Sequence, residues 1–294
     1  MAERILIDRL EFYITNVCNL TCDGCNRYNN YHFKGWQDWN EWAPILEKWA
    51  KKIEVRHPVI LGGEPLLNPT ITQWVTGLRQ LWPEHGGVQI QSNGTRIDRV
   101  KGLYETLNDY NWIGISIHNP ADREEIFQRI RNFLVRPIVE TKNPNHPVGS
   151  YYQFCDANKK WVHCWMSDKF VQSNITELPN GKFGLYNSDP DKAHHNCSFH
   201  QFKNYHWIRG KIYKCGPVAL MPEFDEQHQF AISEQDRSLL HSYSGLSIDE
   251  FDQRGAEFLN TIDDVIPQCK FCPEVYDYKP ITFSDRKKSW KIST

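Results

Sequence analysis

The chain has 294 residues, enough for one large domain with a smaller attachment or for two domains. Its 34 basic residues nearly balance 36 acidic ones, so the net charge of −2 favours neither nucleic acid nor an anionic membrane as a partner. The first residues lack the pattern of a signal peptide, and no window approaches the ~20 apolar residues of a membrane helix. We therefore expect a cytoplasmic protein, in which nine cysteines indicate metal or redox chemistry rather than disulfides.

The first half of the sequence alternates short β-rich runs with amphipathic segments, a pattern typical of βα units around a parallel sheet. A first strand is expected to end at Thr15, and Asp38 to cap a helix with its apolar face on Trp39, Trp42, Leu46, Trp49 and Ile53. Further strands are predicted at 57–61, 86–91 and 112–117, and further helices from about Thr70, around 100–107 and at 126–133.

The second half is less regular. Two more strands are expected around a proline-containing loop after Val135, followed by a polar stretch and a domain boundary near residues 180–195. Residues 205–215 read as a hairpin with Gly210 at its turn, and a helix is predicted near 248–258. The last motif is Cys269-Lys-Phe-Cys272.

Three cysteines, Cys18, Cys22 and Cys25, follow the first predicted strand with no fourth cysteine nearby. A structural zinc site uses four protein ligands, and a ferredoxin supplies a thiolate to every iron of its cluster. Three thiolates instead suit a 4Fe-4S cluster with one iron left open for a substrate or cofactor. The loop also lies where ligands bind in parallel sheets, at the carboxyl end of a strand.

The motif Cys18-Asn-Leu-Thr-Cys22-Asp-Gly-Cys25 resembles the cluster loop of the radical S-adenosylmethionine (radical SAM) superfamily. Gly62-Gly63-Glu64-Pro65 resembles the GGEP motif that receives the methionine amino group of the cofactor in that family. Ser92 and Ser116 stand at the third and fourth strand ends, where relatives hydrogen-bond the cofactor. The resemblance implies a partial (β/α)6 barrel and S-adenosylmethionine bound by Gly62, Gly63, Glu64, Pro65, Ser92 and Ser116.

Four later cysteines, Cys197, Cys215, Cys269 and Cys272, resemble the twitch module, a short relative of the SPASM module that holds an auxiliary cluster. Four thiolates would saturate a second 4Fe-4S cluster and leave it to electron transfer, although a set of four cysteines also suits zinc. This predicts a radical SAM barrel over residues 1–185 and a small α+β cluster domain over residues 186–294.

Several residues have no assigned role. Cys155 and Cys164 are interpreted as free thiols, with a reactive role as the alternative, and His118 is a candidate substrate contact. Relatives place an aromatic residue just before the third cysteine to contact adenine, whereas this chain has Gly24. Tyr28, Tyr31 or Phe33 would then supply the stacking, or aliphatic contacts alone would hold the adenine.

The resemblance implies reductive cleavage of S-adenosylmethionine to a 5'-deoxyadenosyl radical that abstracts a substrate hydrogen. Oxidation or bond formation on a peptide or protein side chain is the first expectation, with flavodoxin or ferredoxin as electron donor. A dehydrogenase or rearrangement enzyme for a small metabolite is the alternative, and a glycyl-radical activase comes third. From another class, the alternatives are a non-catalytic iron-sulfur electron carrier and a zinc-stabilised binding module. The GGEP motif and the nearly balanced charge argue against these two.

Overall fold

The computed structural model describes residues 4–84, 87–108, 110–146, 149–171, 174–275 and 277–283. It divides into two compact units. The first unit is Met1–Leu20 with His32–Lys169, and the second is Thr21–Tyr31 with Phe170–Thr294. Among the helices within these described ranges, none combines the length and the apolar character needed to cross a bilayer. The predicted domain boundary after residue 185 stays a prediction, because compact units and functional domains need not coincide.

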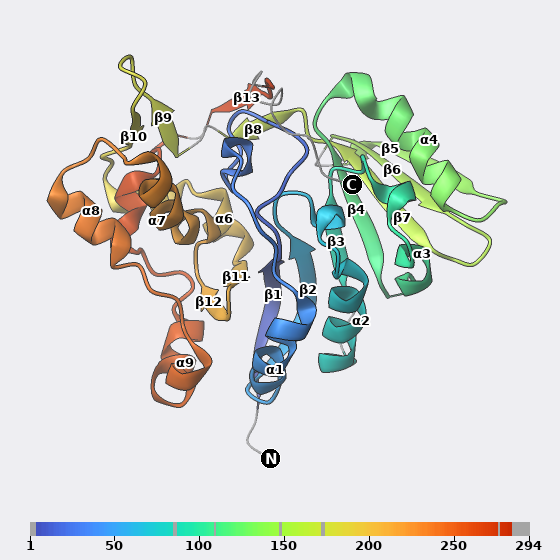
Figure 1. The fold of residues 1–294 in the computed structure, drawn as a ribbon, viewed down its shortest axis with the longest axis horizontal. Helices are drawn as coiled ribbons and strands as arrows, with labels where there is room; N and C mark the ends of the chain where they lie inside the picture. Colours follow the sequence, from blue (N-terminus) through green and yellow to red (C-terminus); the bar gives the residue numbers. More distant parts are fainter. Residues whose placement is uncertain are drawn as a thin grey trace. The chain divides into compact units, whose positions relative to one another are not determined.

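The first unit is built on a mixed sheet whose strands run in the order β1-β2-β3-β4-β7-β6-β5 (Figure 1). Strands β1 to β4 and β7 are parallel, whereas β6 is antiparallel to both of its neighbours. The strands are β1 (Ile5–Tyr13), β2 (Ile53–Leu61), β3 (Gln89–Ser92), β4 (Trp112–Ile117), β5 (Val139–His146), β6 (Gly149–Cys155) and β7 (Trp161–Met166).

The four predicted βα units are present. The helices are α1 (Trp39–Ala50), α2 (Ile71–Leu81), α3 (Leu103–Thr106) and α4 (Arg123–Phe133). Asp38 caps α1 as predicted by accepting from the Asn40 amide, but Ile53 begins β2 instead of continuing the helix. The predicted strand start at Gly86 lies outside the described residues.

After α4 the chain departs from the six-fold βα repeat. The described residues between Leu134 and Lys169 form the meander β5-β6-β7, and Pro137 and Pro144 disfavour a helix in its first part. The fold is therefore a mixed α/β sheet with four βα units. The two strands expected after Val135 correspond to β5 and β6.

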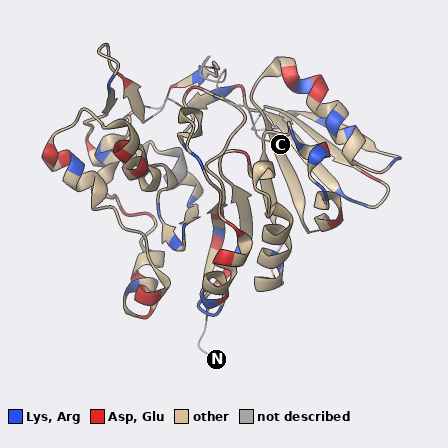
Figure 2. Cartoon of the chain, viewed as in Figure 1, with Lys and Arg blue, Asp and Glu red and all other residues tan. Residues whose placement is uncertain are grey.

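Aromatic packing fastens the helices to one face of this sheet. Phe12 of β1 packs against Trp74 of α2 at 6.5 Å and against Trp82 at 5.9 Å between ring centroids. Phe127 of α4 packs against Phe154 of β6 at 5.1 Å. Truncating such buried rings to alanine typically costs about 3–5 kcal/mol, so these contacts hold the strand ends in place. Charges of both signs intersperse along the outer side of α4 (Figure 2).

The second unit consists of short elements. Its helices are α5 (Pro190–His195), α6 (Ser198–Phe202), α7 (Gly216–His228), α8 (Glu234–His241) and α9 (Phe251–Asn260), with 3-10 turns η1 (Asn29–Tyr31), η5 (Ile248–Glu250) and η6 (Pro267–Phe271). Its strands are β8 (Lys169–Val171, starting at the boundary), β9 (Ile175–Glu177), β10 (Phe183–Leu185), β11 (Tyr205–Ile208), β12 (Lys211–Tyr213) and β13 (Tyr278–Pro280). The predicted hairpin over residues 205–215 is confirmed as β11 and β12, with Gly210 in the turn.

Phe224 on α7 lies at the centre of the core of the second unit. The rings of Tyr28, Tyr31, Phe183 and Phe230 all contact it, with centroid distances between 4.8 and 5.7 Å. Two of these rings come from the segment after the first cysteine loop. The packing of these two rings on Phe224 explains why residues 21–31 belong to the second unit rather than to the sheet that precedes them in sequence.

Candidate active site and cysteine-lined pocket

Cys18 follows the carboxyl end of β1 in a loop that the first unit holds through its backbone. The Val17 amide donates to the Thr15 hydroxyl at 3.1 Å, and the Leu20 amide donates to the Cys18 thiol at 3.4 Å. An amide N–H aimed at sulfur favours a thiolate at this position. The loop then passes into the second unit between Leu20 and Thr21.

The Gly62-Gly63-Glu64-Pro65 turn lies directly against this loop, within the same unit. The Gly63 amide donates to the Thr15 carbonyl at 2.8 Å, and the Glu64 amide donates to the Val17 carbonyl at 2.8 Å. A Cβ at position 63 would stand 2.3 Å from the Val17 carbonyl oxygen, so only glycine permits this approach. The start of the cysteine loop and the glycine turn, which are distant in sequence, thus form one backbone assembly.

The Glu64 side chain is completely buried and accepts three hydrogen bonds from the chain. Its Oε1 accepts from the Leu66 amide at 3.0 Å and from the Ser92 hydroxyl at 2.8 Å, and its Oε2 accepts from the Asn93 amide at 2.7 Å. Burial raises the pKa of Glu64 to about 7. The three hydrogen bonds favour the charged form and oppose this rise, but the effect of burial is larger. The carboxylate thereby connects the turn to the end of β3.

A ring of three polar side chains links the cysteine loop to the turn after β3. Asn93 donates to Asn19 at 2.9 Å, Asn19 donates to the Thr95 hydroxyl at 2.7 Å, and Thr95 donates back to Asn93 at 2.6 Å. Sequence reasoning did not single out these residues, since Asn and Thr beside Gly94 read as an ordinary turn. Hydrogen bonds therefore connect the loop after β1, the turn after β2 and the turn after β3 to one another.

The two predicted serine sites differ in their surroundings. Ser92 is 3% exposed, and its hydroxyl donates to Glu64 and accepts from the Gly94 amide at 2.9 Å. Ser116 is half-buried on β4 and accepts from the Gln91 side chain at 2.7 Å. Ser92 thus connects the Glu64 turn to the turn after β3 by hydrogen bonds, whereas Ser116 lies on a sheet face beside a polar neighbour, Gln91.

Cys22 and Cys25 are held within the second unit. Cys22 is buried and pairs in an isolated β-bridge with Phe283, and the Asp23 amide donates to the Thr282 carbonyl at 2.8 Å. Gly24 has a φ of 79°, in the left-handed region where an aromatic side chain would be strained. This conformation gives a physical reason for glycine where relatives of the resembling family carry an aromatic residue.

The aromatic residues considered for adenine stacking are engaged elsewhere. The Tyr28 ring is fully buried and packs edge-on against Phe224 at 5.7 Å, and Tyr31 packs against Phe183 at 5.3 Å. Phe33 is also buried. These contacts belong to the packing of each unit and leave the adenine contact unassigned.

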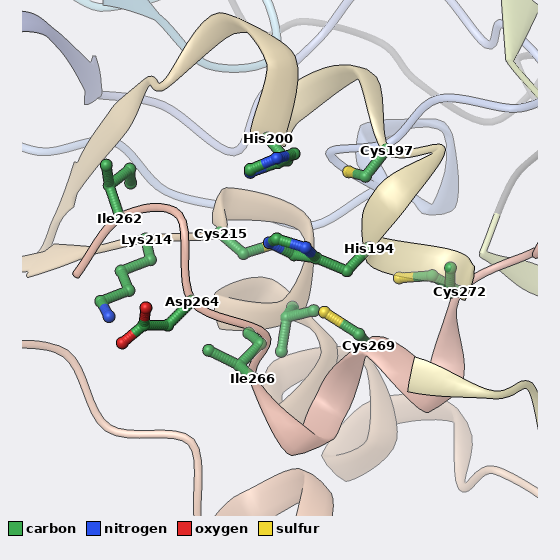
Figure 3. Close-up of a pocket in the computed structure, with 12 residues that line it drawn as sticks. His194, Cys197, His200, Lys214, Cys215, Ile262, Asp264, Ile266, Cys269 and Cys272 are labelled. Carbon is green, nitrogen blue, oxygen red and sulfur yellow. The ribbon is translucent and has the colours of Figure 1, made fainter. Parts of the chain in front are cut away.

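The four later cysteines line one pocket in the second unit (Figure 3). Cys197 precedes α6, Cys215 precedes α7, and Cys269 and Cys272 lie in and just after η6. The pocket encloses about 490 Å³ of space, part of it open to solvent. Its other lining residues are Ala193, His194, His200, Lys214, Val218, Ile262, Asp264 and Ile266.

The four cysteines of this pocket are a donor set that suits both a tetrahedral zinc ion and an iron-sulfur cluster. A tetrahedral zinc holds each sulfur at about 2.3 Å, which places the sulfurs about 3.8 Å from one another. Across the part of the chain that the structure describes, no three His, Cys, Asp or Glu side chains are grouped closely enough to hold one metal ion.

The remaining candidates lie in the first unit. Cys155 and Cys164 occupy the β6-β7 hairpin, but Cys164 pairs with Tyr152 and Cys155 pairs with Trp161, so they face opposite sides of the sheet. Cys164 is fully buried, and burial raises the pKa of its thiol well above the usual range. The His118 Nδ1 lies 3.1 Å from the Ser167 carbonyl oxygen, and burial lowers the pKa of His118.

The first unit is thus an α/β protein in which a cysteine loop, a glycine turn and a polar turn meet at the carboxyl ends of parallel strands. The family model described as Radical SAM superfamily matches residues 12–144, which include Cys18, Cys22, Cys25 and the Gly62–Pro65 turn. Residues 12–144 are therefore similar to the radical SAM superfamily domain, and this similarity covers less than half of the chain.

One solved structure similar to this chain is described as native anSMEcpe with bound AdoMet and Cp18Cys peptide. The sequence identity is 18% and the TM-score 0.31, and the match covers 44% of this chain. The chain spans 40% of the length of that protein. No curated protein matches the sequence.

Proposed function

We propose that this protein is a radical SAM enzyme in which Cys18, Cys22 and Cys25 bind a 4Fe-4S cluster with one open iron. S-adenosylmethionine would be held by Gly62, Gly63, Glu64, Pro65, Ser92 and Ser116, and on reduction it would supply a 5'-deoxyadenosyl radical for hydrogen abstraction. The similarity of residues 12–144 to the radical SAM superfamily domain supports the chemistry. The residue assignments are supported by the motif spacing and by the geometry of the loops.

The observation that carries the proposal is the contact between the glycine turn and the cysteine loop. The Gly63 and Glu64 amides bond to carbonyls of Thr15 and Val17, so the turn stands beside Cys18. A cofactor that touches both a cluster and the GGEP turn needs this proximity. Glu64 anchors the turn, because its carboxylate accepts hydrogen bonds from the Leu66 amide in η2 (Pro65–Leu67), the Ser92 hydroxyl of β3 and the Asn93 amide after it.

For the second unit we propose a twitch/SPASM-like auxiliary 4Fe-4S cluster on Cys197, Cys215, Cys269 and Cys272. The common pocket of these four residues supports this assignment. Four thiolates leave no iron open, so the role is electron transfer rather than substrate ligation. We retain residues 1–185 and 186–294 as the two functional domains.

The proposed reaction is oxidation or bond formation on a peptide or protein side chain, with a small-metabolite dehydrogenase or rearrangement enzyme as the alternative. Flavodoxin or ferredoxin is the proposed electron donor. The mixed charges give no reason to expect nucleic acid or membrane partners. A reducing, cytoplasmic location would keep the nine cysteines as thiols, as cluster binding requires.

Anaerobic reconstitution followed by metal and sulfide analysis tests the proposal. About eight irons per chain are expected for two cubanes, and about four after substituting Cys18, Cys22 and Cys25 by alanine. Formation of 5'-deoxyadenosine with a strong reductant should require all three cysteines. Cys155→Ser is the matched control, because Cys155 lies on β6 outside both cysteine groups. Bound zinc without sulfide, or cofactor cleavage that survives the triple substitution, would refute the assignment.

The substrate class is tested by cofactor turnover. Peptide fractions and low-molecular-weight fractions of a cell extract are added separately to the reconstituted enzyme, and 5'-deoxyadenosine is measured. Stimulation by the peptide fraction that disappears after protease treatment supports a peptide substrate. Stimulation confined to the low-molecular-weight, protease-resistant fraction supports the small-metabolite alternative.

A further inference from the structure

Asn174 makes a direct contact with one of the four pocket cysteines. Its Nδ2 donates to the Cys272 sulfur at 2.8 Å, and both residues are 8% exposed. Asn174 lies immediately before β9, far from Cys272 in sequence, and no motif distinguishes it. An amide N–H that donates to the sulfur of a metal ligand, without touching the metal, can change the reduction potential of the metal centre.

Two buried tyrosine hydroxyls lie in the same environment. The Oη atoms of Tyr28 and Tyr186 are buried, and neither has a hydrogen-bond partner among the described residues. Tyr186 stands two residues before Ser188, whose amide donates at 2.9 Å to the carbonyl of Lys270, between Cys269 and Cys272, and Tyr28 packs on α7, the helix that begins after Cys215. Because an unpaired buried hydroxyl is energetically unfavourable, we expect an acceptor that satisfies both hydroxyls at this place.

Tyr28 also connects the pocket with the first cysteine loop. Its amide donates to the Cys25 carbonyl at 3.1 Å, closing the turn after that cysteine. Its ring packs on Phe224 of α7, the helix that begins directly after Cys215. The position of the Tyr28 hydroxyl is therefore fixed by this backbone hydrogen bond and by the packing of the ring, and not by a polar partner among the described residues.

We propose that Asn174, Tyr28 and Tyr186 form a hydrogen-bond donor shell around the Cys272 side of the auxiliary cluster and raise its reduction potential. This inference rests on the proposed function of the pocket. Reduction adds one negative charge to a cluster, and N–H and O–H donors near its sulfurs stabilise that added charge. The shell therefore favours acceptance of an electron by the cluster. Sulfide and thiolate sulfurs are acceptors that would satisfy both unpaired hydroxyls.

Asn174→Leu, Tyr28→Phe and Tyr186→Phe test the donor shell. They are introduced into the chain that carries Cys18→Ala, Cys22→Ala and Cys25→Ala, so that only the auxiliary cluster contributes a signal. Iron and sulfide are measured after anaerobic reconstitution, and the midpoint potential is determined by redox titration followed by electron paramagnetic resonance. Each variant should retain the cluster and shift its potential to a more negative value.

Tyr205→Phe is the matched control. The Tyr205 hydroxyl is also buried, but it donates to the Leu259 carbonyl at 2.7 Å and its residue does not line the pocket. This variant should unfold more easily and leave the potential unchanged. In the metal-free protein, Tyr28→Phe and Tyr186→Phe should be no less stable than the parent chain, because each removes a hydroxyl that lacks a protein partner.

The outcomes separate the inference from the proposed function. A reconstituted second cluster whose potential is the same in all three variants overturns the donor shell and leaves the auxiliary cluster standing. A pocket that takes up zinc without sulfide, or no metal, overturns the auxiliary cluster and the donor shell together. Loss of stability without a shift in potential would show a purely structural role and would also overturn the inference.

Discussion

The Glu64 amide nitrogen and the Val17 carbonyl oxygen lie 2.8 Å apart and join the glycine turn to the residue before Cys18. This single backbone hydrogen bond connects the ends of two neighbouring parallel strands, β1 and β2. We therefore expect a substitution that displaces the backbone of the turn to displace the cysteine loop as well. The predictions below test this assembly and the sheet that supports it.

Gly63→Ala is expected to displace the cysteine loop. The new Cβ would stand 2.3 Å from the Val17 carbonyl oxygen and 2.6 Å from its carbon, and these are backbone atoms that cannot rotate away. We expect a loss of about 1–3 kcal/mol in the free energy of unfolding and reduced iron at the first cluster, measured by urea unfolding and metal analysis.

Gly35→Ala is the comparison for this variant. Gly35 has a φ of 93° and open space around its Cα, so alanine there adds backbone strain without a clash. It should cost about 1 kcal/mol. Equal iron content in Gly63→Ala and the wild type would show that the close approach at position 63 is not needed for cluster binding.

Glu64→Gln should destabilise the first unit, because the amide nitrogen of glutamine cannot accept the hydrogen bonds that a carboxylate oxygen accepts. At least one buried N–H is left without an acceptor, at a cost of about 1–3 kcal/mol. The pKa of Glu64, raised by burial to about 7 from 4.5, also makes this contribution depend on pH.

The sign of that dependence follows from proton binding. The folded state holds a proton on Glu64 more tightly than the unfolded chain does. The stabilisation of the folded state that comes from this proton is therefore complete below pH 4.5 and is lost as the pH rises through 7. The stability difference between wild type and Glu64→Gln, from urea unfolding at pH 5 and pH 8, should therefore narrow at pH 8. Exposed Glu84→Gln is the control. If the stability difference between wild type and Glu64→Gln widened as the pH rises, the hydrogen bonds to the carboxylate would affect the pKa of Glu64 more than its burial does.

Asn19→Ala and Asn93→Ala should be non-additive. Each removes a member of the hydrogen-bonded ring with Thr95, so the second substitution costs less than it does alone. A double-mutant cycle by urea unfolding should give a coupling of about 0.5–1 kcal/mol. The control pair is Gln128 and Asn132, which share an exposed hydrogen bond of 3.0 Å on α4 and should couple by no more than about 0.5 kcal/mol. Strict additivity of Asn19 and Asn93 would contradict the ring.

His163 is expected to make the sheet sensitive to acid. Burial lowers its pKa to about 4 from 6.5, and its Nδ1 lies 2.5 Å from the Tyr151 hydroxyl. The unfolded chain therefore binds more protons between these pH values, and stability falls as the pH is lowered from 6.5 to 4. His163→Phe should weaken the loss of stability between pH 8 and pH 5, measured by urea unfolding. Exposed His57→Gln should leave that loss unchanged, and an unaltered pH dependence in His163→Phe would argue against a buried neutral imidazole.

The sequence alone determined the order of strands and helices in the first half and the positions of both cysteine groups. The spacing of apolar residues was sufficient because each βα unit buries its own apolar face. Asp38 caps α1 and Trp112–Ile117 forms β4, both as predicted. The strands β5 and β6 were predicted, whereas the parallel pairing of β7 with β4 and the division of the cysteine loop between two units were not. Both depend on contacts between distant residues, such as those of Tyr28 and Tyr31 with Phe224.

Only the tertiary structure decided how the motif residues are used. The Glu64 carboxylate accepts hydrogen bonds from the Ser92 hydroxyl and the Asn93 amide, contacts that no sequence pattern predicted, while the cofactor roles of Glu64 and Ser92 stay predictions. Asn19, Asn174 and Tyr186 carry no sequence signal, because a polar side chain acquires a specific role only from the partners that folding brings to it. Spacing along the chain predicts which cysteines share a site. The donors around them are set by long-range packing, which no local pattern records.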